Sequence, residues 1–84
     1  MEYFKRFDLK NPSVKEFFSL EDGKLRCIII KFNNEIEVLD YYIKGDKINE
    51  YLLFAEKIDK ETFDKAKSII DRLNTILRYN YFNL

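Results

Sequence analysis

Residues 17–32 read "FFSLEDGKLRCIIIKF", and this stretch decides the fold. Two runs rich in Phe, Leu and Ile flank Asp22-Gly23, a pair that favours the positive φ angles of a tight hairpin turn. Apolar residues occupy both alternating sets of positions in these runs, so both faces of the resulting sheet carry apolar side chains. The stretch therefore predicts a β-hairpin, and it raises the question of what covers its second face.

The composition indicates one small globular domain that spans residues 1–84. The chain is 46% hydrophobic and 17% aromatic, and its 15 basic residues balance 15 acidic ones to give a formal net charge of zero. Neutrality removes the long-range attraction on which binders of nucleic acids and anionic membranes rely, and it mildly favours self-association. The amino terminus has no signal-peptide pattern, and no apolar run approaches the roughly 20 residues of a membrane span, so we expect a cytoplasmic protein.

Two further turn pairs, Asn33-Asn34 and Gly45-Asp46, follow the first at intervals of about a dozen residues. Residues 13–58 are therefore expected to form an antiparallel meander of four strands, over residues 14–21, 24–32, 35–44 and 47–57. Pro12 separates this meander from residues 1–12, which we expect to form an edge strand or a packed arm.

Two of these segments also fit a helix. Ser13 and Glu16 form a capping box, which would start a short helix over 14–20. Ile48, Tyr51 and Leu52 recur at helical spacing within 47–57. We favour a strand over 47–57, because the third strand would otherwise lack a hairpin partner beyond Gly45-Asp46.

The carboxyl-terminal part of the chain predicts one long helix. Asp59 is a good N-cap, and apolar residues then recur at steps of three and four through Leu77, which places the helix at 59–79 and leaves an aromatic tail at 80–84. The predicted fold is α+β: a four-stranded antiparallel meander with one helix packed on one face. A coiled-coil dimer through this helix is a minor alternative, since its apolar seam spans fewer than three heptads.

Two-residue turns would fix the register and so divide the side chains between two faces. We assign the helix to the face with the small residues, which holds Phe18, Leu20, Leu25, Cys27, Ile29, Ile36, Val38, Leu53 and Ala55. The opposite face would be the interaction face, and its predicted residues are Phe17, Arg26, Ile28, Ile30, Leu39, Tyr41, Leu52 and Phe54. An apolar row inside a charged rim has the anatomy of an association surface. In the alternative, residues 1–12 or the aromatic tail fold over this face.

The sequence carries no motif for a reaction or a cofactor. It contains no His, one Cys and two glycines that both fall in predicted turns, so a catalytic imidazole, a zinc knuckle and a phosphate-binding loop are all missing. We expect Cys27 to be a buried core residue. The predicted function is non-enzymatic protein–protein interaction, with a second copy as the most economical partner. An accessory or inhibitory protein of a low-GC bacterium or its phage, such as one that blocks a host defence enzyme, would fit this size and composition.

Two rival functions remain open. A single-stranded nucleic-acid binder would stack bases on Phe17 and neutralise phosphates with Lys15 and Arg26. A magnesium-dependent nuclease would use Glu35, Glu37 and Glu56 as metal ligands, which the expected register brings to one edge of the sheet.

Overall fold

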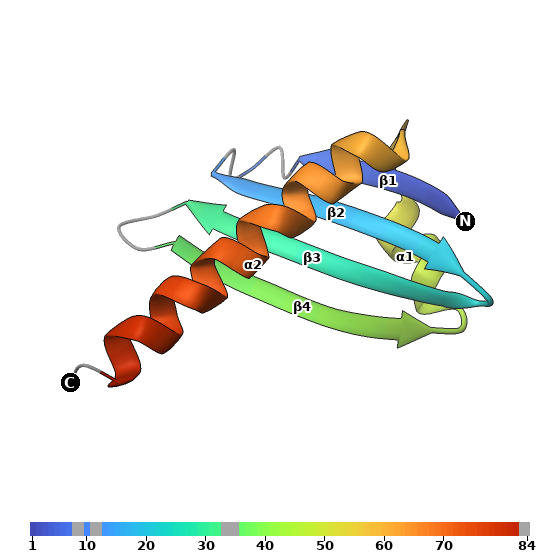
Figure 1. Cartoon of the computed structure of the whole chain (residues 1–84). Helices are drawn as coiled ribbons and strands as arrows, with labels where there is room; N and C mark the ends of the chain where they lie inside the picture. The colour runs from blue at the N-terminus through green and yellow to red at the C-terminus, as the bar shows by residue number, and fades with distance from the viewer. Residues whose placement is uncertain (8–9, 11–12, 33–35, 83–84) are drawn as a thin grey trace.

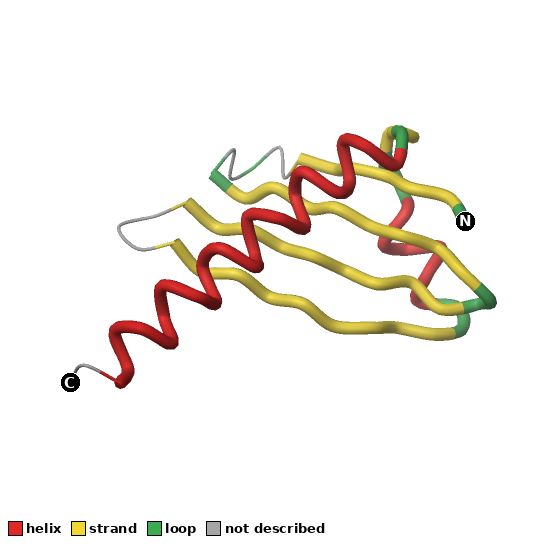
Figure 2. Tube along the Cα trace, viewed as in Figure 1, coloured by secondary structure: helices red, strands yellow, loops and turns green. Residues whose placement is uncertain are grey.

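The computed structural model describes residues 1–7, 10, 13–32 and 36–82, with side chains as far as Arg72. The chain forms five strands and two helices (Figures 1 and 2). Their order is β1 (Glu2–Phe7), β2 (Val14–Glu21), β3 (Lys24–Phe32), β4 (Ile36–Lys44), α1 (Lys47–Leu52), β5 (Glu56–Ile58) and α2 (Lys60–Phe82).

The strands form one antiparallel sheet in the order β4-β3-β2-β1-β5, so the predicted α+β fold class is confirmed. Residues 14–21 are a strand rather than the alternative short helix. The β2–β3 hairpin has the predicted register, with Phe18 opposite Cys27 and Leu20 opposite Leu25. Its turn residues Asp22 and Gly23 have φ angles of 52° and 72°, as a type I′ turn requires. β1 lies inside the sheet because β5 pairs with its outer side.

The predicted register of β4 is wrong by one residue. Phe32 pairs with Ile36, which leaves three residues between the strands instead of two. Ile29 therefore lies opposite Leu39, and Ile30 lies opposite Val38. Because side chains alternate along a strand, this slip moves every β4 side chain to the other face of the sheet.

The predicted strand over 47–57 is also corrected. The turn at Gly45 leads into the six-residue helix α1, and only Glu56–Ile58 is a strand, paired with β1 rather than with β4. These residues form a helix rather than a strand because the helix places its apolar side on the sheet. Ile48, Tyr51 and Leu52 pack against a buried cluster of Phe18, Leu25 and Cys27.

The long helix covers the face that we predicted to be open. Phe63, Ala66 and Ile70 of α2 are buried, and Phe63 and Ile70 join Ile28 and Ile30 of β3 in a second core cluster. Two helices thus cover opposite faces of the sheet, and residues 2–7 form the strand β1 within it. The assignment of α2 to the face of Phe18, Leu25 and Cys27 is wrong, since α1 covers that face.

The helix α2 begins as predicted but runs on to Phe82. Asp59 caps it by accepting a 2.8 Å hydrogen bond from the Thr62 amide. Residues 80–82 of the predicted tail belong to the helix, and 83–84 lie outside the described residues. In Figure 1, α2 crosses the sheet diagonally and its carboxyl-terminal half passes beyond the corner where β4 begins. No helix in the described part of the chain is both long enough and apolar enough to cross a membrane.

Candidate functional site

The strand β4 forms the long free edge of the sheet. Its nine residues pair with β3 along their whole length, and no described strand lies on its other side. Every second backbone N–H and C=O group of an edge strand points outward, where another strand can pair with it. The opposite edge, β5, has only three residues, two of which are the exposed and charged Glu56 and Lys57. β4 is therefore the edge with the length to accept a further strand.

Large apolar side chains are exposed along β4. The exposed fractions are 53% for Ile36, 37% for Leu39 and 63% for Tyr42. Ile36 and Tyr42 lie on the α2 side of the sheet, and Leu39 lies on the α1 side. We call these three residues and the outward backbone groups of Ile36–Lys44 the β4 edge surface.

The neighbouring strand holds β4 in place through an ion pair. Arg26 of β3 donates hydrogen bonds of 3.0 and 2.8 Å to the two carboxylate oxygens of Asp40. Hydrogen bonding to Asp40 raises the pKa of the Arg26 guanidinium above its ordinary value. A two-pronged pair of this kind fixes geometry as well as charge. Asp40 consequently carries a paired charge on the edge strand.

The α1 side of β4 is anchored by two tyrosines. The hydroxyl groups of Tyr41 and Tyr51 lie 3.1 Å apart, and the two rings meet edge to face. Burial, together with this hydrogen bond, raises the pKa of Tyr41. Tyr41 therefore ties the edge strand β4 to α1.

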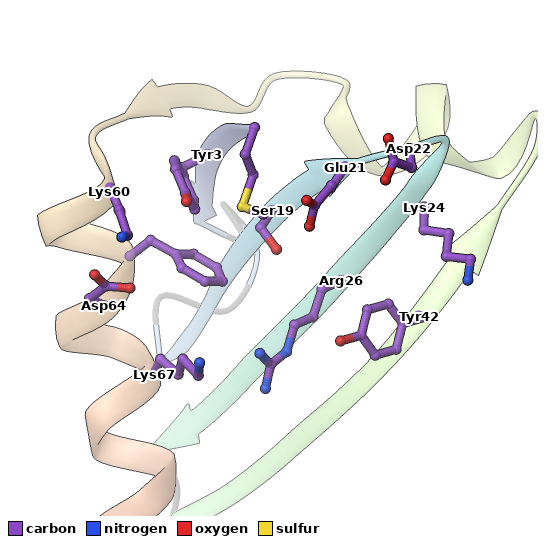
Figure 3. Close-up of a pocket in the computed structure, with 12 residues that line it drawn as sticks. Tyr3, Ser19, Glu21, Asp22, Lys24, Arg26, Tyr42, Lys60, Asp64 and Lys67 are labelled. Carbon is purple, nitrogen blue, oxygen red and sulfur yellow. The ribbon is translucent and has the colours of Figure 1, made fainter.

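A cleft of about 430 Å³ opens on the α2 side, between the first turns of α2 and the end of the sheet at the β2–β3 turn (Figure 3). In Figure 3, Lys67 of α2 points towards Arg26, and Tyr42 lies on the far side of Arg26. The remaining polar lining mixes both signs of charge: Glu21, Asp22, Lys24, Lys60 and Asp64. This balance gives the cleft no strong preference for an anion or a cation.

Two further exposed apolar residues, Leu53 and Phe54, lie in the turn between α1 and β5, near the edge of the sheet opposite β4. Leu53 has φ −61° and ψ 126°, Phe54 has φ 62°, and the Ala55 amide bonds to the Leu52 carbonyl at 2.9 Å, which defines a type II turn. Phe54 occupies the turn position that favours glycine, yet 87% of it is exposed. Arg6 holds the end of α1, just before this turn, by donating to the carbonyl oxygens of Tyr51 at 2.6 Å and Glu50 at 3.2 Å, and its Nε donates to Glu16.

The structure does not gather the eight predicted interaction residues on one face. Phe17, Ile28 and Ile30 belong to the core beneath α2, and Arg26 lies on the same side, in the cleft. Tyr41 and Leu52 pack in the cluster beneath α1, and Leu39 is half-exposed on that side. Phe54 lies in the turn after α1 and belongs to neither of the two core clusters. The exposed residues Ile36 and Tyr42 were missed, because the sequence predicted a further strand on the outer side of β4, whereas β4 is an edge strand.

The predicted magnesium ligands are not brought together. Glu37 lies on β4 and Glu56 on β5, at opposite edges of the sheet, while Glu35 lies outside the described residues. The described residues contain no group of three potential metal ligands.

The two basic residues of the nucleic-acid hypothesis, Lys15 and Arg26, lie on the α2 side of the sheet, as Phe17 does. Arg26 is paired with Asp40, and the Lys15 ammonium lies 5.5 Å from the centre of the Phe32 ring. Phe17 is packed in the core cluster beneath α2, so its ring does not form an open stacking platform.

Cys27 is fully buried, as predicted, and burial raises the pKa of its thiol to about 11. A thiol with such a pKa is unreactive at neutral pH.

No family model matches the sequence, and neither a curated protein nor a solved structure gives a significant match.

Proposed function

We propose that this chain is a non-enzymatic, cytoplasmic protein–protein interaction module that forms a homodimer by antiparallel pairing of two β4 strands. The observation that carries the proposal is the β4 edge surface: a nine-residue edge strand whose apolar side chains are exposed on both faces. Natural sheets commonly protect such an edge with prolines, bulges or inward-pointing charges. Pro12 is the only proline of the chain, so β4 has none, and its Asp40 is neutralised by Arg26.

A second copy of this chain is a better partner for the β4 edge than a highly charged molecule would be. The zero net charge gives two copies little mutual repulsion. Pairing centred on Tyr41 would set Leu39 opposite Ile43 of the second copy on the α1 side. It would set Asp40 opposite Tyr42 on the α2 side, where the tyrosine hydroxyl can donate to the carboxylate. Pairing centred on Asp40 would instead place two like charges face to face, which disfavours that register.

Each hydrogen bond formed between the two strands would contribute about 1 kcal/mol net, and burial of the exposed parts of Leu39 and Tyr42 would add to this. The product would be a continuous ten-stranded sheet with α1 helices on one face and α2 helices on the other, because a two-fold axis perpendicular to the sheet preserves its faces.

Solution mass by light scattering over a concentration series tests the proposal. The wild type should approach twice the 10.2 kDa chain mass as its concentration rises. Leu39→Glu should stay at the mass of one chain with an unchanged far-ultraviolet circular dichroism spectrum, because Leu39 is already half-exposed.

Leu53→Glu is the matched control. It introduces the same charge at an exposed leucine near the opposite edge of the sheet, with an exposed fraction of 59%, and it should dimerise like the wild type. A wild type that stays monomeric, or a Leu39→Glu variant that still dimerises, would refute the proposal.

A further inference from the structure

The carboxyl-terminal half of α2 extends beyond the sheet of its own chain. At a rise of about 1.5 Å per residue, the 23 residues of α2 span roughly 34 Å. Among the residues of α2 whose side chains the structure describes, 60–72, the buried ones are Phe63, Ala66 and Ile70. The chain is accordingly elongated, with a longest extent of 42 Å and a radius of gyration of 13.8 Å. A compact domain of this length would have a radius of gyration of about 12 Å.

The two halves of α2 differ sharply in charge. The first half, residues 60–72, contains seven charged residues: Lys60, Glu61, Asp64, Lys65, Lys67, Asp71 and Arg72. The second half, residues 73–82, has one charged residue, Arg78. Most of its other residues are apolar or aromatic: Leu73, Ile76, Leu77, Tyr79, Tyr81 and Phe82. A helix that projects into water is expected to be polar all round. The composition of residues 73–82 is that of a segment covered by another surface.

The sheet has an open area on the same side as α2. α2 crosses towards the corner where β4 begins and leaves the opposite end of β4 uncovered (Figure 1). That uncovered area holds the cleft of Figure 3, with Arg26 at its centre and the exposed ring of Tyr42 beside it. The charge of Arg26 is already paired with Asp40, which lowers the cost of covering it.

Antiparallel pairing of two β4 strands would bring these two features together. It sets the Ile36 end of one β4 beside the Lys44 end of the other, and the two-fold axis keeps both α2 helices on the same face. Residues 73–82 of each copy leave their own sheet past the Ile36 end. They would therefore arrive over the Lys44 end of the second copy, where the open area lies.

We propose that residues 73–82 of α2 dock on the open sheet face of the second copy, against Tyr42 and over the cleft at Arg26. The inference rests on the proposed homodimer and deepens it, because it makes each cleft complete only in the dimer. The occupant is a helix of the same chain, which would cover the two clefts reciprocally.

Isotope-filtered nuclear Overhauser spectroscopy on the full wild-type chain tests this docking. Carbon-13-labelled and unlabelled chains are mixed, exchanged and studied at a concentration where light scattering shows a dimer. We expect cross-peaks between the ring protons of Tyr42 in one copy and the methyl groups of Leu73, Ile76 or Leu77 in the other. Cross-peaks between Tyr41 and its counterpart, which report β4 pairing alone, serve as the internal control.

The possible outcomes separate the two proposals. Cross-peaks within β4 alone would overturn the docking of α2 and leave the homodimer intact. Cross-peaks that join only the two 73–82 segments to each other would indicate a coiled coil and would also overturn the docking. A mass of one chain at every concentration would overturn the homodimer and the docking together.

Discussion

Arg26 and Asp40 join β3 to the edge strand β4 through two hydrogen bonds, on the part of the α2 face that the helix leaves uncovered. Both side chains are partly exposed, so the pair contributes modestly to the stability of the chain. In the proposed dimer the pair would have a second role, because Arg26 would neutralise Asp40 near the centre of the β4 edge surface.

Replacement of Arg26 should therefore affect dimerisation more than folding. Arg26→Met should lower the free energy of unfolding by about 0.5–1 kcal/mol, measured by urea denaturation at a concentration where the chain is monomeric. It should weaken the dimer further, since each Asp40 then meets the second copy unpaired. The double variant Arg26→Met with Asp40→Asn should recover dimerisation, and a failure of that recovery would argue against the neutralising role.

Arg6 should be the most important charged residue for folding. It joins Glu16 of β2 to the carbonyl groups at the end of α1, and both side chains of the pair are largely buried. Arg6→Lys keeps the charge but loses the planar set of donors, so it should cost about 2 kcal/mol of unfolding free energy in urea denaturation. Lys5→Met, which removes a longer and more exposed ion pair with Glu56, should change stability much less. Equal losses would contradict this ranking.

Phe54 should reduce stability rather than support it. It holds φ 62° in a type II turn and is almost fully exposed, so its ring gains little from burial. Phe54→Gly should raise the unfolding free energy by about 1 kcal/mol, because glycine adopts positive φ without the steric cost that other residues incur. Thermal unfolding provides the measurement, and Phe7→Gly in β1 is the control that should destabilise. A less stable Phe54→Gly variant would mean that the ring makes contacts that its exposure does not suggest.

Asp59 should give the chain a defined acid sensitivity. Hydrogen bonding by Thr62 at the start of α2 lowers the pKa of the Asp59 carboxyl below its ordinary value of 3.8. The folded pKa is thus lower than the unfolded one, so the stabilisation is complete above the unfolded pKa and is lost as the pH falls through the folded pKa. Asp59→Asn should lack this part of the pH dependence in urea denaturation series. A carboxyl titration by carbon-13 NMR that returned an ordinary pKa for Asp59 would contradict the cap.

Local patterns predicted much of the fold. The Asp22-Gly23 turn fixed the β2–β3 register because both residues adopt positive φ, and Asp59 marked the start of α2. The register of β4 could not be predicted in the same way, since Asn33-Asn34 fits a two-residue turn whereas Phe32 and Ile36 pair across three residues. That single slip exchanged the two faces of β4 and with them Leu39 and Tyr41, two of the eight residues of the predicted interaction face.

The second error had a tertiary cause. The sequence of residues 47–52 fits both a strand and a helix. The helix α1 forms because it lets the Tyr51 ring pack edge to face against Phe18 and Tyr41 of the sheet. A pattern within the segment does not contain that information. The exposure of Ile36 and Tyr42 follows from the same two corrections, so the candidate site emerged only with the three-dimensional structure.

Hydrogen exchange of the backbone amides, followed by NMR from dilute to concentrated solution, tests the central claim most directly. If two β4 strands pair, every second amide between Ile36 and Lys44 should exchange more slowly as the concentration rises. The amides of Glu56–Ile58 at the opposite edge should not change. Amides of β4 that exchange at the same rate at every concentration, in a chain that otherwise remains folded, would contradict the account.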